Sequence, residues 1–187
     1  MKKLMMIAIM MIAAVSAKAQ NEVGQVSIKP MAGINLATMT KADNAKTRVG
    51  LAAGLDFEYG VAENFGISAG VLYSMQGAKI EGLIGGNDKV TMKLDYINIP
   101  VLANFYIVKG LAIKAGVQPG FNVQKKLDDA KLDDVKGFAL SVPVGLSYEF
   151  ANVVLDARYN WGLTKAFKEG GSKNSYFTIT LGYRIPF

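Results

Sequence analysis

Eight charged residues fall at alternate positions of apolar segments, where acidic and basic side chains could form ion pairs or pass protons. Four are acids and four are bases, so their charges balance: Asp56, Glu58, Glu149, Asp156, Lys29, Lys114, Arg158 and Arg184. A buried ion is costly unless an opposite charge and hydrogen bonds accompany it. The balance therefore predicts a network of salt bridges that holds the surrounding strands together. A path for protons or ions is the functional alternative, and no excess of one charge favours it.

The reactive residues give little support to catalysis. The chain contains no His and no Cys, so it lacks the commonest general base at neutral pH and cannot form disulfides or thiolate metal sites. Ser68, Ser74 and Ser141 lie in no recognisable nucleophile motif. We therefore expect no enzyme activity and no cofactor. A Ser–Lys or carboxylate mechanism is the remaining catalytic alternative.

A cluster of acidic residues raises the possibility of calcium binding, since calcium takes several oxygen ligands. The acids share one segment with as many lysines: Asp128, Asp129, Asp133, Asp134, Lys125, Lys126, Lys131 and Lys136. The spacing of the acids differs from that of an EF-hand loop. A solvated loop that neutralises its own charges is therefore favoured over a metal site.

Two further segments are basic and could contact phosphate groups of lipopolysaccharide. They contribute six cations: Lys41, Lys46, Arg48, Lys165, Lys168 and Lys173. Ordinary solvated loop charges explain these residues equally well. No run of five or six like charges occurs, so the sequence predicts no nucleic-acid partner.

The elements that must position the charged residues are strands. Between residues 49 and 59, Leu51 and Leu55 fall on one face while Gly54 and Asp56 fall on the other. A period of two residues is typical of a strand with one apolar face. The alternation recurs in eight segments, each 11 to 13 residues long: 26–36, 49–59, 65–75, 94–105, 111–123, 138–148, 153–163 and 176–187. A tilted strand needs roughly 9 to 11 residues to cross a bilayer.

The connections between these segments alternate in length. Those around residues 60–64, 107–110 and 149–152 are short, whereas the other four are long: 37–48, 76–91, 124–137 and 164–175. This pattern predicts an all-β fold, an eight-stranded antiparallel up-and-down transmembrane β-barrel formed by residues 20–187. It also predicts long outer loops and places both termini in the periplasm.

A sheet that spans a membrane must close on itself, because open edges in lipid would leave backbone N–H and C=O groups unpaired. Eight strands enclose room for side chains only, so no open pore is expected. Small residues crowd the expected inner face and leave space for the charged side chains, for example Gly70, Gly145 and Gly182.

Sixteen of the 18 aromatic residues fall near strand ends, as expected for girdles at the two membrane surfaces. The predicted periplasmic girdle contains Phe57, Tyr59, Phe65, Phe105, Tyr106, Tyr148, Phe150, Tyr183 and Phe187. The predicted outer girdle contains Tyr73, Phe121, Phe138, Tyr159, Trp161, Tyr176 and Phe177. A soluble lipocalin-like barrel or sandwich, the structural alternative, would place many aromatic residues in mid-strand.

The first 19 residues have the pattern of a cleaved signal peptide. Lys2 and Lys3 precede an apolar run over residues 4–17, and Ala17-Lys18-Ala19 supplies a cleavage motif. The run is shorter than the roughly 20 residues of a membrane-spanning helix. Removing residues 1–19 eliminates three lysines and lowers the net charge from +6 to +3.

Residues 26–187 resemble small outer-membrane barrels, most closely those of the PorT-like family. The resemblance rests on residues 95–101 (Asp-Tyr-Ile-Asn-Ile-Pro-Val), 155–163 (Leu-Asp-Ala-Arg-Tyr-Asn-Trp-Gly-Leu) and 182–187 (Gly-Tyr-Arg-Ile-Pro-Phe). It implies contact with outer-membrane lipid, a structural or binding role and a possible protein partner. Phe187 looks like the terminal signal that barrel-assembly machinery reads. The family's namesake is associated with protein secretion, so an accessory role in secretion is the alternative function.

Overall fold

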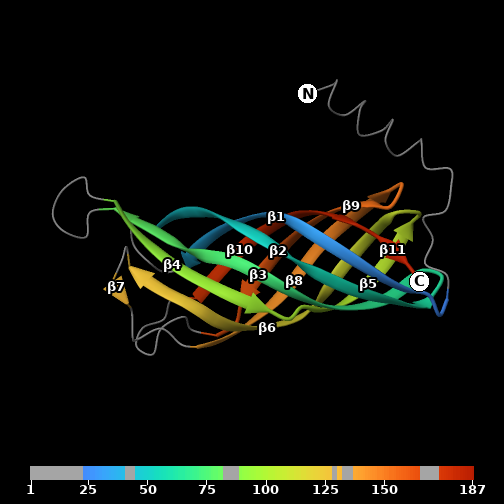
Figure 1. Ribbon diagram of the computed structural model, residues 1–187, viewed down its shortest axis with the longest axis horizontal. Coiled ribbons are helices and arrows are strands. Elements are labelled where there is room, and N and C mark those ends of the chain that lie inside the picture. The colour runs from blue at the N-terminus through green and yellow to red at the C-terminus, as the bar shows by residue number, and fades with distance from the viewer. Residues whose placement is uncertain (1–22, 41–44, 82–88, 128–129, 132–136, 165–172) are drawn as a thin grey trace, which may run out of the picture.

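The computed structural model describes residues 23–40, 45–81, 89–127, 130–131, 137–164 and 173–187, which form one closed antiparallel sheet (Figure 1). Closure occurs because the first strand pairs with both the second strand and the last long one. The strands are β1 (Val26–Thr40), β2 (Ala45–Ala62), β3 (Phe65–Glu81), β4 (Lys89–Asn98), β5 (Val101–Val108), β6 (Leu111–Leu127), β7 (Ala130–Lys131), β8 (Phe138–Phe150), β9 (Val153–Gly162), β10 (Lys173–Tyr183) and β11 (Ile185–Pro186). No helix in these ranges is long and apolar enough to cross a membrane. The predicted signal peptide, residues 1–19, lies outside the described residues.

The barrel has eight strand positions, which confirms the predicted architecture. β4 and β5 together occupy one position between β3 and β6, β11 continues the course of β10, and β7 flanks the end of β6. The prediction of one continuous strand over residues 94–105 was therefore wrong. Pro100 has no N–H to donate, so the ladder is interrupted there. Backbone bonds from Ile99 N to Pro119 O (2.8 Å) and from Gly70 N to Pro100 O (3.0 Å) bridge the interruption.

Most strands extend further than predicted at the long-loop end. β2 begins at Ala45 and β3 continues to Glu81, so parts of the predicted loops 37–48 and 76–91 belong to the sheet. The alternating apolar pattern does not continue into these extensions, so the period of two could not reveal them. At the opposite end the connections are short, and Ala151 and Asn152 adopt positive φ values of 47° and 71° in the turn between β8 and β9.

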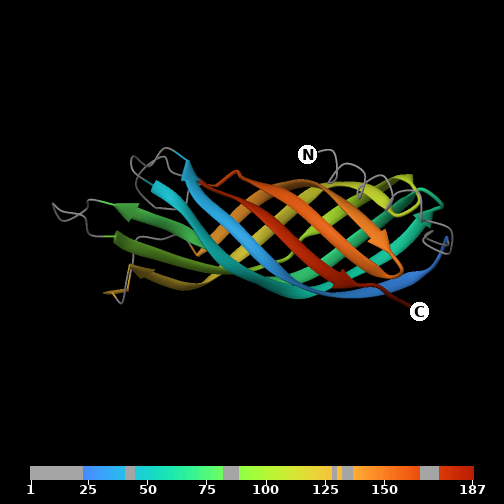
Figure 2. The same ribbon diagram turned by 90° about the horizontal axis from the view of Figure 1, so that it is seen from above.

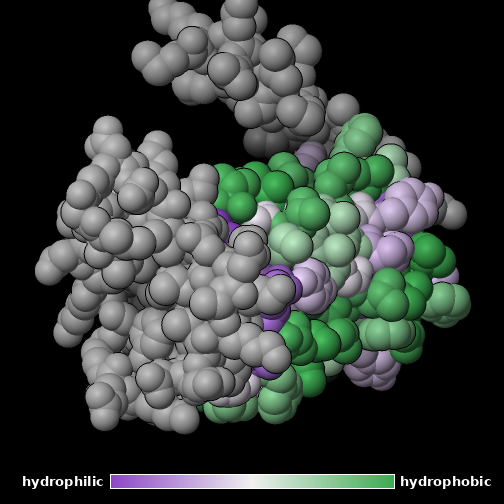
Figure 3. Space-filling model, turned by 60° about the vertical axis from the view of Figure 1, so that its left-hand side comes forward, coloured by the Kyte–Doolittle hydropathy of each residue, from purple (hydrophilic) through white to green (hydrophobic). Residues whose placement is uncertain are grey.

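The two faces of the sheet differ as predicted. Leu51, Leu55 and Val117 point outward and are 61%, 44% and 50% exposed, whereas Asp56 and Arg158 are 2% exposed. Figure 3 shows one side of this wall, where hydrophobic residues predominate. Figure 2 shows the strong tilt of the strands around the interior. A water-soluble barrel would have the opposite distribution, so the soluble alternative is excluded.

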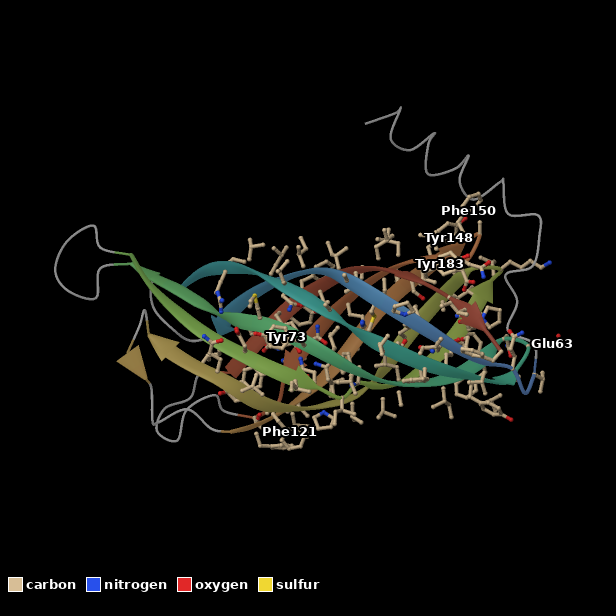
Figure 4. All side chains as sticks on the ribbon, viewed as in Figure 1. Glu63, Tyr73, Phe121, Tyr148, Phe150 and Tyr183 are labelled. Atoms are coloured by element: carbon tan, nitrogen blue, oxygen red, sulfur yellow. The ribbon has the colours of Figure 1, made fainter. Side chains whose placement is uncertain are left out.

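Aromatic residues gather near both ends of the outer wall, but two of those assigned to the girdles face the interior. Tyr148, Phe150 and Tyr183 lie near the short-turn end (Figure 4), while Trp161 and Tyr159 stack edge to face further along, with ring centroids 6.3 Å apart. Tyr106 and Tyr176 were wrongly assigned to the girdles, because both side chains face the interior. Each lies beside an outward-facing Phe, and neighbouring residues of a strand point to opposite faces.

Candidate functional site

The charged interior begins with a cross-strand pair. Lys29 on β1 lies directly opposite Asp56 on β2, and Lys29 Nζ is 2.9 Å from Asp56 Oδ2. Glycines on the neighbouring strands provide the space. A Cβ on Gly182 would lie 2.9 Å from Lys29 Cγ, and one on Gly70 would lie 3.0 Å from Asp56 Oδ1. The strand order thus places a glycine beside each member of the Lys29–Asp56 pair.

A second group is centred on Asp156 of β9. Its carboxylate contacts Lys114 Nζ at 3.1 Å and Arg158 Nε at 2.6 Å. Gly145 on β8 lies opposite both Lys114 and Arg158 in the ladder. A Cβ at Gly145 would lie 2.2 Å from the backbone oxygen of Ala157 and 2.6 Å from Arg158 Cγ, so any other residue here would displace the backbone of β9 as well as the arginine.

A third group lies at the short-turn end. Arg184 Nη2 is 3.2 Å from Glu58 Oε1, and Arg184 Nε is 2.8 Å from Glu149 Oε2. Tyr106 joins this group from β5: its hydroxyl donates to Glu58 and accepts from Arg184 Nη2 at 2.6 Å. All eight charged residues named from the sequence are therefore buried, and each contacts at least one opposite charge.

Sequence reasoning missed a further ion pair, between Arg48 and Asp95. Arg48 Nη1 lies 3.6 Å from Asp95 Oδ1 and donates to the carbonyl of Gln76. Tyr73, on the lipid-facing wall, donates to Asp95 Oδ2 at 2.8 Å. Arg48 was placed in an outer loop, but it belongs to β2 and is buried. Asp95 escaped notice because the register between β4 and β6 shifts beside it.

Neutral polar side chains fill the part of the interior nearer the long loops. Asn35 Nδ2 donates to Ser74 Oγ at 2.8 Å, and Asn35 Oδ1 accepts from Thr178 Oγ1 at 2.8 Å. Tyr176 accepts from both Gln118 and Asn98. Between this region and the charged groups lies a small apolar cluster of Met31, Ala52 and Leu72. The amides and hydroxyls of the polar region carry no charge. The balance of acids and bases in the sequence therefore could not reveal them.

The buried charges of the interior are balanced. In the described residues the buried charged groups comprise five acids and five bases: Asp56, Glu58, Asp95, Glu149, Asp156, Lys29, Arg48, Lys114, Arg158 and Arg184. Among those residues, no three His, Cys, Asp or Glu side chains are grouped to hold a metal ion. The acidic segment for which a solvated loop was favoured over a calcium site, with Asp128, Asp129, Asp133 and Asp134, lies outside the described residues, as do Lys41, Lys165 and Lys168.

Comparison with protein families decides the membrane in which this barrel resides. Residues 18–168 match the model of the outer membrane protein beta-barrel domain. The chain belongs to that family. An outer-membrane β-barrel of this kind exposes its apolar wall to lipid, which accounts for the outward-facing Leu, Val and aromatic residues.

Solved outer-membrane proteins share this fold at low sequence identity. Ail, the attachment invasion locus protein of Yersinia pestis, has a TM-score of 0.53 and 17% identity, covering 88% of this chain and 100% of Ail. Neisserial surface protein A has a TM-score of 0.54 and 15% identity, with 86% and 97% covered. OprG from Pseudomonas aeruginosa has a TM-score of 0.51 and 16% identity, with 90% and 99% covered. No curated protein matches the chain by sequence.

Proposed function

We propose that this outer-membrane barrel is a closed scaffold with a structural or binding role at its surfaces, and that it does not conduct solutes. The observation that carries the proposal is the paired, buried charge inside the barrel, where Arg158, Lys114 and Asp156 are each 1–2% exposed. A conducting pore needs polar groups that face water rather than one another. With its interior occupied by its own side chains, such a barrel acts through its wall and its two ends. We assign it no catalytic role.

Conductance across a planar bilayer tests the closed state. The purified wild-type barrel should give no stable current. Arg158 is the largest fully buried side chain among the described residues, so Arg158→Gly should open space in the interior and give a small, measurable current. A steady current from the wild-type protein would refute the proposal.

Structural and binding roles differ in what they require of the long loops. Replacing residues 82–88 and 165–172 with short Gly-Ser linkers should leave the barrel and its heat-modifiable gel mobility intact. In a strain that lacks the chromosomal gene, a structural role is supported if the linker variant restores membrane integrity as well as the wild type. A binding role is supported if the variant fails to restore it while accumulating normally.

The orientation in the membrane follows from the same proposal. The start of β1 and the C-terminus lie at the short-turn end (Figure 1), and Ser27 pairs with Pro186 there. We place this end in the periplasm, because outer-membrane barrels have short periplasmic turns and long outer loops. A Cys at Val23 should resist a membrane-impermeant maleimide on intact cells and react after the outer membrane is permeabilised. Labelling on intact cells would reverse the orientation.

A PorT-like accessory role in secretion is the second candidate, and it rests on the resemblance of residues 95–101, 155–163 and 182–187. Asp95 in the first of these motifs contacts Arg48 and Tyr73, a role within the barrel itself. Photocrosslinking from outward-facing positions in intact cells distinguishes the candidates. Capture of a secretion component would favour the accessory role, whereas a barrel that crosslinks to lipid only would favour the scaffold.

A further inference from the structure

Four polar atoms in one part of the interior have no hydrogen-bond partner in the protein. They are Asp56 Oδ1, Ser68 Oγ, and both Oδ1 and Nδ2 of Asn104. The three residues are 2%, 1% and 0% exposed, respectively. A buried polar group without a partner is strongly destabilising, and such groups in native proteins are usually satisfied by ordered water or an ion.

The strand register brings the three residues together. Asp56 lies opposite Gly70, and Asn104 lies opposite Gly66, so Ser68 sits between them on β3 as the diagonal neighbour of each. Diagonal neighbours on one face of a sheet are about 7–8 Å apart at their backbones, and less at their side chains. One molecule that makes two hydrogen bonds of about 2.8 Å fits a gap of this kind.

The same stretch of β3 carries only small residues on its inward face. Its three successive inward positions are Gly66, Ser68 and Gly70, and the largest side chain among them is a hydroxymethyl group. Leu102 lies directly opposite Ser68 and is buried. Toward the long loops, the next inward residue of β3 is Leu72, which belongs to the apolar cluster with Met31 and Ala52.

The chemistry of the four atoms selects the ligand. The set contains acceptors, at Asp56 Oδ1 and Asn104 Oδ1, and a donor, at Asn104 Nδ2, so a molecule that both donates and accepts is required. Lys29 lies 2.9 Å from Asp56, Lys114 lies opposite Asn104 and Glu58 lies opposite Ser68, so the charges around the site offset one another and favour no metal cation. An anion would meet the carboxylate of Asp56. Water meets every condition, and buried waters typically make about three hydrogen bonds.

We propose that the interior holds a bound-water site formed by Asp56, Ser68 and Asn104. The site hydrates the carboxylate of the Lys29–Asp56 pair from the side opposite the lysine. Because it concerns the interior alone, this proposal stands or falls independently of the surface role proposed above.

Two other buried asparagines provide matched controls. Asn160 Nδ2 donates to Thr178 Oγ1 at 2.9 Å, and Asn35 Nδ2 donates to Ser74 Oγ at 2.8 Å. Both residues are as buried as Asn104, at 2% and 0% exposure. They differ from it in that their amides have protein partners.

The test is NMR of the folded barrel, labelled with 15N-asparagine, in a lipid nanodisc. Asn104→Leu and Asn160→Leu assign the two side-chain amide signals. We expect a water cross-peak at the Asn104 amide and none at Asn160 or Asn35. An Asn104 amide without a water cross-peak, like that of Asn160, would overturn the proposal.

Ser68→Ala removes one partner of the water and should weaken the Asn104 cross-peak several-fold. An unchanged cross-peak in that variant would show that Ser68 does not bind the water and would overturn the proposed site. Titration with NaCl and KCl should leave the Asn104 amide shifts unchanged. Saturable, cation-specific shifts would show a bound metal ion and would refute water as the ligand.

Discussion

Arg184, near the C-terminus, donates a hydrogen bond of 2.6 Å to the hydroxyl of Tyr106 on β5 and holds its guanidinium 5.9 Å from the centre of that ring. The contact joins the link between β10 and β11 to the middle of the chain across the interior. Glu58 accepts from the same hydroxyl, so Tyr106 connects two of the charges that close the short-turn end.

Tyr106→Phe should destabilise the barrel by about 1–3 kcal/mol, because it removes a hydroxyl that serves two charged partners. Urea unfolding from lipid vesicles, followed by tryptophan fluorescence, measures the change. Tyr159→Phe is the control, since Tyr159 is exposed to lipid and stacks on Trp161 through its ring. Equal stability of Tyr106→Phe and the wild type would show that the hydroxyl contributes nothing.

Asp156→Asn should cost about 3–5 kcal/mol, because it leaves Lys114 and Arg158 buried without their common counter-charge. Unfolding in the same vesicles reports the loss. Glu63→Gln serves as the comparison, since Glu63 lies in an exposed turn between β2 and β3 (Figure 4). If the two variants unfold at the same urea concentration, the internal ion pairs do not stabilise the barrel.

Gly145→Ala should reduce the yield of folded barrel, whereas Gly137→Ala should not. A methyl group at Gly145 would lie 2.2 Å from the backbone oxygen of Ala157 and 2.6 Å from Arg158 Cγ, while nothing lies within 4 Å of the corresponding position at Gly137. The fraction of heat-modifiable protein on a gel measures folding. Normal yields of both variants would mean that β8 and β9 can move apart at this point, contrary to the tight packing described above.

The free-energy cost of a charge on the lipid-facing wall should depend on its depth in the membrane. Val144→Arg, midway along β8, should cost about 2–4 kcal/mol, and Phe150→Arg, at the end of that strand, about 0–1 kcal/mol. The two side chains are 50% and 48% exposed, so exposure alone predicts equal effects. Folding free energies in vesicles distinguish the two expectations, and equal costs would contradict a membrane-embedded β8.

Phe187→Ser should impair assembly in cells more than folding in the test tube. We propose that Phe187 is part of a signal for barrel-assembly machinery, since its side chain is 77% exposed while its backbone N–H donates to Val26 O at 2.8 Å. The variant should accumulate poorly in the outer membrane yet refold normally into vesicles. A parallel loss in both assays would assign Phe187 a structural role.

The period of two was enough to predict the eight-stranded barrel and the direction of most side chains. It placed Asp56 inside and Leu55 outside, as observed. It failed where the ladder is irregular. Pro100 divides one predicted strand, and Asp95, beside a register shift, was not recognised as buried. Local alternation carries no information about a position where two residues of one strand face one residue of the next.

The sequence alone could not predict which charged residue pairs with which. The count of acids and bases indicated that they balance, but many pairings satisfy that count. Asp156 contacts Lys114 and Arg158, and Arg184 contacts Glu58 and Glu149. The register of the closed sheet determines these pairs, because it sets the height of each side chain along the barrel axis. Tyr106 was misassigned for the same reason, since its hydroxyl meets Glu58 and Arg184 only in the assembled barrel.

The positions of the charges along the chain also bear on how the barrel enters the membrane. Lys29 meets Asp56 within one hairpin, and Asp156 meets Arg158 on a single strand. Lys114 and Arg184, however, meet their acids only when distant strands have joined. A half-formed sheet would carry these unmatched ions into hydrocarbon at great cost. We therefore expect insertion to be concerted with closure, so that hairpins do not cross the bilayer one at a time.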